Sequence, residues 1–114
     1  MSLEDFLLVL FENKGIGYSD EIKQLVEKNY EFLKQYAENK IIYGINTGLG
    51  PMAQYKIDDD KSIDLQLNLI RSHSSGAGNP LDELSVLASL LIRARCFCGG
   101  YSGIHPDVLA ILKD

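Results

Sequence analysis

A tyrosine and a histidine, each beside a glycine-rich turn, are the residues of this chain best suited to chemistry. Tyr43 opens the run Tyr-Gly-Ile-Asn-Thr-Gly-Leu-Gly-Pro, and His73 precedes Ser-Ser-Gly-Ala-Gly-Asn-Pro. A tyrosine is a weak base at its ordinary pKa of about 10. Nearby donors that stabilise its phenolate would let it take a proton from an activated C–H. A histidine opposite could bond a polar ring of a substrate, although a lone histidine is more often structural.

The glycine-rich run after this tyrosine has the composition of a turn that lets the backbone approach a ligand. Gly44, Gly48 and Gly50 permit backbone conformations with positive φ. Their spacing differs from the dinucleotide-binding and P-loop patterns, which argues against nucleotide binding. A plain structural turn stays open as an interpretation. The tyrosine at its edge and the Asn46-Thr47 pair, which we expect to be exposed, favour a loop that faces a ligand.

Composition and charge exclude several classes of function. The chain has 114 residues and a formal net charge of −5, with a pI of about 4.9. This acidity argues against nucleic acid, which needs a basic face, and against an anionic membrane surface. No apolar run approaches the ~20 residues of a transmembrane helix, and no signal peptide is visible. We therefore expect one cytoplasmic domain that binds neither nucleic acid nor membrane.

Two clusters could suggest a metal or a disulfide, and both have simpler interpretations. Cys96 and Cys98 stand two apart on an expected helix, so their side chains point in different directions. No second cluster completes a zinc site, and we expect buried reduced thiols. The acidic run 58–60 is interpreted as a helix N-cap with first-turn acids on a solvated surface. The sequence therefore predicts no metal.

Two helices are expected before the tyrosine loop. Ser2 and Asp5 have the spacing of a capping box, and the apolar run behind them would form a helix that ends before the first glycine turn. Ser19 is the next N-cap candidate. Apolar residues from Ile22 onward then recur at helical spacing, opposite lysines and glutamates, which predicts a helix to about Glu38.

The segment between the two glycine-rich turns is ambiguous. Residues 63–70 fit both the alternation of a strand and the period of a helix, so the pattern alone leaves both open. The acids ahead of it and its leucines and glutamines favour a helix. His73 is then expected in the turn 71–80.

A helix that is apolar on almost every side follows. Asn79 and Pro80 are expected as its N-cap and first residue, and the helix would run from Leu81 to about Cys98 and stop at the Gly-Gly pair. A further helix would begin near Pro106. Because a helix apolar all round belongs inside a large core, this chain is expected to be a piece of a longer protein.

Three blocks of the sequence resemble one family in its own order. The run from Tyr43 to Gly50 closely resembles the tyrosine-loop motif of the aromatic amino-acid ammonia-lyases, the family of histidine, tyrosine and phenylalanine ammonia-lyases and related aminomutases. Leu-Gln-x-Asn-Leu-Ile-Arg-Ser-His-Ser-Ser-Gly-x-Gly at 65–78 is similar to the next block, and Tyr-Ser-Gly-Ile at 101–104 to the third. The resemblance covers nearly the whole chain.

The resemblance implies a fold and an organisation. Residues 1–114 would be the mainly α-helical N-terminal fragment of a longer lyase, with the catalytic tyrosine loop at 43–57 and the histidine turn at 71–80. The longer enzyme would be a cytoplasmic homotetramer. Its electrophile would be 4-methylidene-imidazol-5-one, which forms from an internal Ala-Ser-Gly. No Ala-Ser-Gly occurs in this chain, so the fragment alone is expected to be inactive.

The resemblance also implies roles for individual residues. Tyr43 matches the base that removes the β-proton of the amino acid, and His73 matches the residue that touches the substrate's ring. The glycines of the loop, with its Asn-Thr pair, would form a lid that excludes water. Leu49 departs from the family's usual aromatic residue, so the loop is expected to pack differently.

The favoured activity is elimination of ammonia from L-histidine to give urocanate, a step of histidine catabolism. Tyrosine ammonia-lyase and an aromatic aminomutase are the alternatives within the family. From a different class, a non-catalytic helical module could use the apolar helix 81–98 to bind a partner.

Overall fold

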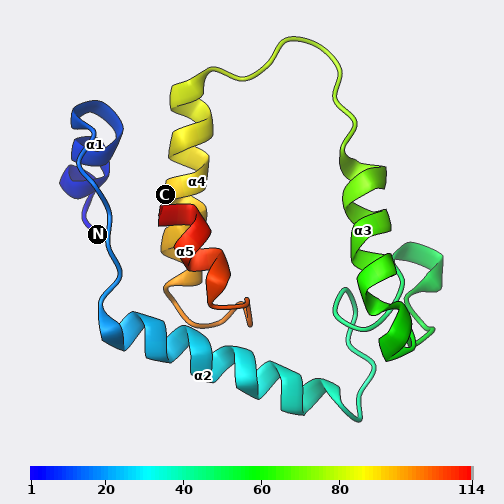
Figure 1. Ribbon diagram of the computed structural model, residues 1–114. Helices are drawn as coiled ribbons and strands as arrows, with labels where there is room; N and C mark the ends of the chain where they lie inside the picture. The colour runs from blue at the N-terminus through cyan, green and yellow to red at the C-terminus, as the bar shows by residue number, and fades with distance from the viewer. Residues whose placement is uncertain (114) are drawn as a thin grey trace. The chain divides into compact units, whose positions relative to one another are not determined.

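The part of the chain that the structure describes is mainly helical, with loops between the helices. The computed structural model describes residues 1–113, the side chains at positions 52 and 59 excepted. Within this range lie α1 (Leu3–Glu12), α2 (Asp20–Ala37), α3 (Ser62–His73), α4 (Glu83–Phe97) and α5 (Asp107–Lys113), with the 3-10 turns η1 (Gly50–Met52) and η2 (Asp59–Lys61) (Figure 1). The predicted mainly α fold is confirmed. None of the helices so described has the length and hydropathy to cross a membrane.

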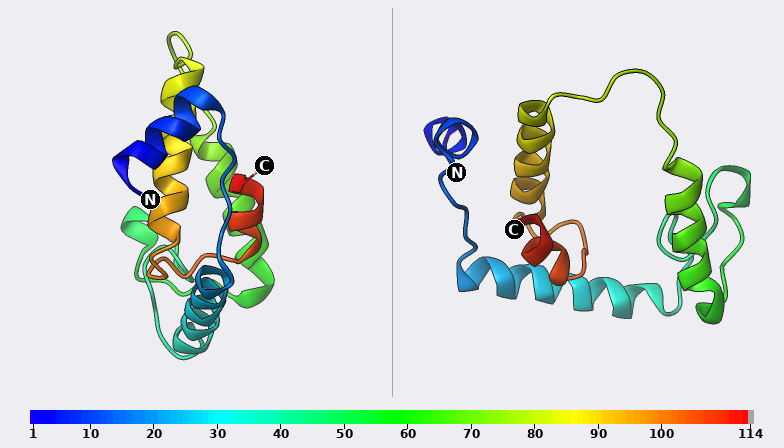
Figure 2. Two further views of the ribbon diagram at one scale, coloured as in Figure 1. Left: turned by 90° about the vertical axis from the view of Figure 1, so that its left-hand side faces the viewer. Right: turned by 45° about the horizontal axis from the view of Figure 1, so that its top comes forward.

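The helices are divided between two compact units. One unit comprises Met1–Leu33 with Pro80–Asp114, and the other comprises Lys34–Asn79. The first contains α1, α4, α5 and most of α2, and α4 lies beside α5 in both views of Figure 2. The second contains the tyrosine loop and α3. Both candidate site residues therefore belong to the second unit.

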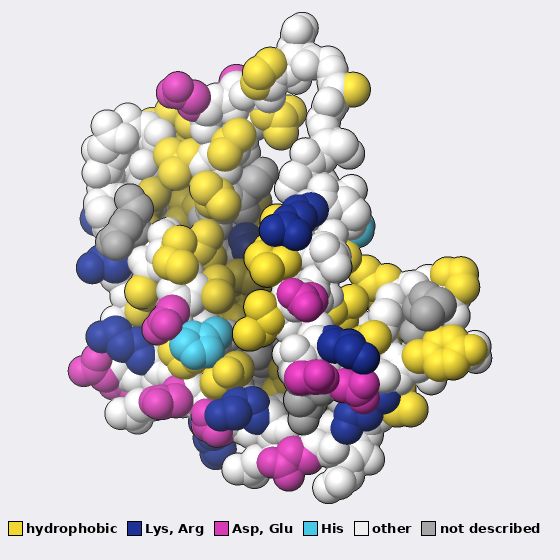
Figure 3. Space-filling model, turned by 45° about the vertical axis from the view of Figure 1, so that its right-hand side comes forward, with side chains coloured by type: hydrophobic (Ala, Val, Ile, Leu, Met, Phe, Trp, Pro, Cys, Tyr) yellow, Lys and Arg dark blue, Asp and Glu magenta, His cyan; other side chains and the backbone are white. Residues whose placement is uncertain are grey.

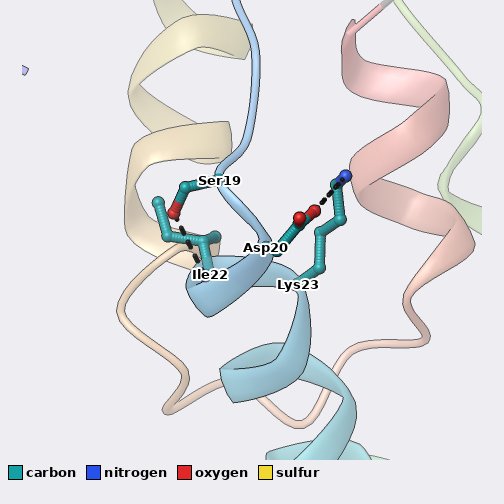
Figure 4. Close-up of polar contacts among 4 residues, drawn as sticks. All are labelled: Ser19, Asp20, Ile22 and Lys23. Atoms are coloured by element: carbon teal, nitrogen blue, oxygen red, sulfur yellow. Dashed lines mark hydrogen bonds and ion pairs between the residues drawn. The ribbon is translucent and has the colours of Figure 1, made fainter.

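The N-termini of α1 and α2 form as the sequence predicts. In α1, the backbone N–H of Asp5 donates to Ser2 Oγ (3.1 Å), and the backbone N–H of Ser2 donates to Asp5 Oδ2 (2.9 Å). These bonds complete a capping box. In α2, the N–H of Ile22 donates to Ser19 Oγ (3.4 Å), beside the Asp20–Lys23 ion pair (Figure 4). The helix ends at Ala37, one residue earlier than predicted.

The predicted N-caps of α3 and α4 are wrong. A bond from the N–H of Lys61 to Asp58 O (2.9 Å) closes a 3-10 turn first, and α3 begins only after it. In α4 the cap is Asp82, which accepts a bond from the N–H of Ser85 (2.9 Å). Asn79 lies three residues before Asp82 and so cannot cap a helix whose first residue is Glu83. The ambiguous segment 63–70 is helical, as favoured.

The first unit has a small core and a large exposed apolar surface. Its fully buried hydrophobic residues come from α2, α4 and α5: Val26, Leu91, Ala94 and Leu109. Most other apolar residues of α4 are exposed, and yellow side chains are prominent at the surface in Figure 3. The prediction of buried thiols is wrong in part, because Cys96 is exposed and Cys98 is half-buried. The outer face of α4 thus has the composition of a core and no cover from the described residues.

The loop between α4 and α5 packs closely on α2. The N–H of Gly103 donates to Asn29 Oδ1 (2.6 Å), and the rings of Tyr30 and His105 meet edge to face with centroids 4.9 Å apart. Gly100 has φ +70° and its Cα faces Leu25. These contacts attach the α4–α5 loop to the part of α2 that belongs to the first unit.

Candidate functional site

Tyr43 stands at the exposed edge of the loop that follows α2. Its side chain is 63% exposed, and the neighbouring Ile45 is 43% exposed. The phenol of Tyr43 therefore lies at the surface, and its position depends on the backbone of the loop more than on packing of the side chain. An exposed ring can meet a ligand supplied from outside this unit.

Asn46 anchors the loop to the end of α2. Its Nδ2 donates to Ala37 O (3.1 Å) and Lys40 O (2.8 Å), and its Oδ1 accepts from the N–H of Ile42 (2.8 Å). The side chain is half-buried. One amide thus satisfies two carbonyls and one N–H group around the start of the loop.

Thr47 is buried beneath the loop, with 1% of its surface exposed. Its hydroxyl donates to Gly48 O (2.8 Å) and accepts from the N–H of Gly44 (3.3 Å). The prediction that the Asn46-Thr47 pair is exposed is therefore wrong. Both side chains pair with backbone groups that a turn leaves without partners, and a buried group of that kind is costly when unpaired.

The three glycines of the loop differ in backbone conformation and in burial. Gly44 has φ +74° and Gly50 has φ +58°, where a residue with a Cβ is strained. Nothing lies within 4 Å of the position of a Cβ at either residue. Gly48 is buried and its carbonyl bonds Thr47. Gly44 and Gly50 thus shape the backbone of the loop, whereas Gly48 lies in its anchored part.

The far side of the loop closes back on the same anchor. The N–H of Ile57 donates to Asn46 O (2.9 Å), and Lys56 pairs with Thr47 in an isolated antiparallel bridge. Lys56 Nζ also donates to Glu38 O at the end of α2 (3.2 Å). Sequence reasoning missed these anchoring contacts. An Asn beside small turn residues was the available signal, because its amide commonly bonds nearby backbone.

His73 is the last residue of α3, not part of a turn as predicted. Its side chain is exposed. Its Nδ1 lies 2.9 Å from Leu69 O and 3.1 Å from Ser72 Oγ. A carbonyl oxygen only accepts, so the contact with Leu69 requires a proton on Nδ1. In the neutral imidazole Nε2 is then an acceptor that a ligand could use.

This chain contains no Ala-Ser-Gly, the tripeptide from which the sequence resemblance implies that an electrophile would form. Tyr43 and His73 supply a phenol and an imidazole, which can accept protons and hydrogen bonds. They do not replace an electrophile.

Comparison with known proteins places these residues in a family. The family model for aromatic amino acid lyases matches residues 1–114. A probable histidine ammonia-lyase of Thermoplasma acidophilum is 38% identical over 115 residues, which cover 100% of this chain and 23% of that protein.

Solved structures that share this fold over nearly the whole of this chain agree with the family match. Ergothionase from Treponema denticola has a TM-score of 0.90 at 31% identity, over 99% of this chain and 23% of its own. Tyrosine aminomutase from Streptomyces globisporus has a TM-score of 0.80 at 31% identity, over 99% of this chain and 22% of its own. The chain thus spans less than a quarter of the length of these relatives. It belongs to the aromatic amino acid lyase family.

Proposed function

We propose that this chain is the N-terminal part of an ammonia-lyase that converts L-histidine to urocanate and ammonia. The observation that carries the proposal is that one compact unit contains both an exposed Tyr43 on an anchored loop and a His73 whose Nε2 has no partner among the described residues. Relatives described as histidine ammonia-lyases support the choice of substrate. The longer enzyme would be a cytoplasmic homotetramer, and its 4-methylidene-imidazol-5-one would form outside these residues.

Tyr43 acts as the proton acceptor in this proposal. The proton leaves the β-carbon of the amino acid for the phenolate oxygen, the bond between the α-carbon and nitrogen breaks, and a double bond forms between the two carbons. The phenolate needs donors or positive charge nearby to exist near neutral pH. Those groups would come from the remainder of the enzyme, and the ring is exposed enough to meet them.

His73 recognises the substrate's ring. With Nδ1 donating to Leu69 O, the free Nε2 can accept a bond from the N–H of an imidazole. A phenylalanine ring offers no such donor and leaves Nε2 unpaired, which costs about 1–3 kcal/mol when the site is dry. The site would therefore reject phenylalanine by roughly 5- to 150-fold.

A tyrosine ammonia-lyase or aromatic aminomutase is the second candidate. The same Nε2 would accept a bond from a phenol O–H, and tyrosine aminomutases are among the structures that resemble this chain. An aminomutase would return the amino group to the neighbouring carbon instead of releasing it. The product, rather than the binding residues, distinguishes these reactions.

The test uses the longer enzyme with Tyr43→Phe and the matched control Tyr55→Phe. Tyr55 lies in the same loop and is also exposed (54%), so both variants should fold like the parent. Tyr43→Phe should lower kcat by about 10²- to 10⁴-fold, the range for loss of an acid–base group. Tyr55→Phe should retain activity. Full activity of Tyr43→Phe would refute the assigned base.

Substrate choice is tested on the parent enzyme with L-histidine, L-tyrosine and L-phenylalanine side by side. Urocanate as the main product supports the proposal, whereas coumarate or a β-amino acid selects the second candidate. A preference for phenylalanine would contradict the role given to His73. The 114 residues alone should form no unsaturated acid. No turnover of any of the three by the longer enzyme would favour the non-catalytic module.

A further inference from the structure

The end of α2 needs partners that the helix itself does not supply. The last carbonyl oxygens of an α-helix find no N–H donor within the helix and must accept bonds from other groups. Asn46 Nδ2 reaches one of them, Ala37 O (3.1 Å), and also Lys40 O in the following turn (2.8 Å). The side chain of Asn46 therefore caps α2 from a position nine residues beyond its last residue.

The same amide holds the residue directly before the tyrosine. Asn46 Oδ1 accepts from the N–H of Ile42 (2.8 Å), while the N–H groups of Ile45 and Asn46 donate to Ile42 O (3.1 and 3.2 Å). The peptide groups on both sides of Ile42 are thus fixed. An aspartate or serine could not make all these side-chain contacts, because only an amide combines two N–H donors with an acceptor.

Tyr43 has few other constraints on its position. Its side chain is 63% exposed, so packing against this chain does little to orient it. Its backbone direction follows from Ile42, and Ile42 is held by Asn46. We propose that Asn46 is the positioning residue of this loop: its amide clamps the loop to the end of α2 and thereby places the phenol of Tyr43. The inference rests on the proposed function only where it concerns catalysis.

The clamp also restricts how the loop can move. Asn46 bonds Ile57 through its own carbonyl (2.9 Å), and Thr47 and Gly48 are buried beside it. A lid that closes would therefore move at its exposed edges, while the segment 46–48 stays attached to α2. The glycines with positive φ, Gly44 and Gly50, stand at the two borders of this anchored segment.

The first test measures amide hydrogen exchange by NMR in the 114-residue chain and in its Asn46→Asp variant. Aspartate keeps the acceptor for Ile42 but turns a carboxylate towards the carbonyls of Ala37 and Lys40. Exchange at Ile42 and Ile57 should accelerate about tenfold or more at pH 7, as for loss of a hydrogen bond that leaves its partners unpaired. Amides of α4 should be unchanged.

Asn39→Asp is the matched control. Asn39 is exposed and lies in the same turn after α2, so this variant adds the same charge at the same helix end. It should leave exchange at Ile42 as in the parent. Equal acceleration in both variants would refute the clamp, since charge at the helix terminus would then explain the effect. Acceleration that is uniform over the whole chain would also refute it.

A pH series tests the hydrogen bonds themselves. A protonated aspartate regains one O–H donor and loses the repulsion from the carbonyls, so the excess exchange at Ile42 should shrink as pH falls and the new carboxyl takes up its proton. If Asn46→Asp does not fold, Asn46→Gln replaces it in the test. Glutamine keeps both N–H donors and the acceptor on a longer side chain, so this variant should fold, and its exchange rate at Ile42 should lie between those of the parent and of a chain without the clamp. Parent-like exchange in every variant at position 46 would overturn the proposal.

The catalytic arm uses the longer enzyme. Asn46→Asp should lower kcat at least tenfold with little change in KM, because the base is displaced while the groups that bind the amino acid remain. Faster exchange at Ile42 with an unchanged kcat would refute the positioning role and leave the proposed function intact. Full activity of Tyr43→Phe would instead mean that the proposed function has failed, whatever happens at Asn46.

Discussion

The contact between the Gly100 turn and α2 allows a quantitative prediction. Gly100 has φ +70°, and a Cβ at this position would lie 2.5 Å from Leu25 Cγ and 2.9 Å from Leu25 Cδ2. Gly100→Ala therefore combines two costs, backbone strain and a steric clash. The clash involves the branch carbon of Leu25, which can move only if the whole side chain changes rotamer.

Each cost has a known scale. An L-residue in the left-handed region costs about 1–2 kcal/mol, and an extra methyl forced into a packed contact costs about 1–3 kcal/mol. Leu25 is 44% exposed and can partly swing away, which favours the lower part of the second range. Gly100→Ala should thus lower the free energy of unfolding by about 2–4 kcal/mol. That is a large share of the about 5–15 kcal/mol that typically holds a domain together.

The assay is urea unfolding followed by far-ultraviolet circular dichroism, in a double-mutant cycle with Leu25→Ala. Removing the leucine side chain should relieve the clash, so the two substitutions should be less destabilising together than the sum of the single effects by about 1–2 kcal/mol. Gly17→Ala is the control, because no atom lies within 4 Å of its Cβ position and its φ is not positive. Strict additivity, or a Gly100→Ala effect no larger than that of Gly17→Ala, would refute the reasoning.

Two further predictions concern polar groups of the first unit. Within the described residues the buried hydroxyl of Tyr18 has no hydrogen-bond partner, and burial raises the pKa of this hydroxyl. Tyr18→Phe removes no hydrogen bond and should therefore leave the urea midpoint unchanged or raise it. A lower midpoint would contradict this prediction. Bonds from Ser85 lower the pKa of the Asp82 carboxyl below its usual 3.8. Its stabilisation of α4 is thus present above the unfolded-state pKa and lost as pH falls through the folded-state pKa. Asparagine can cap a helix but does not titrate. Asp82→Asn should therefore remove the loss of helix content that follows from protonation of Asp82 when circular dichroism is recorded at falling pH. If the same loss persists in the variant, the assignment to Asp82 is contradicted.

Local signals were enough to predict the helices and their first two caps. Ser2 and Asp5 are three residues apart and bond each other, so the capping box depends on no distant partner. The caps of α3 and α4 were mispredicted for an equally local reason. Three aspartates precede α3, yet Lys61 stands at its N-cap position without a side-chain bond. Asn79 and Asp82 both precede α4, and only Asp82 caps it. The pattern alone does not decide at which residue either helix begins.

Periodicity in the sequence was enough to predict the helices, and the ordered motifs were enough to predict the family. The same motifs name Tyr43 and His73 as candidate site residues, and that assignment stays a prediction. The surroundings of these residues could be read only from the folded chain. Asn46 and Thr47 have the composition of an exposed polar pair, yet they bond backbone groups that the turn brings within reach. The partners of Asn46 lie four, six and nine residues away. These separations arise because the chain folds back on the end of α2. A pattern of residue types contains no information on that fold-back.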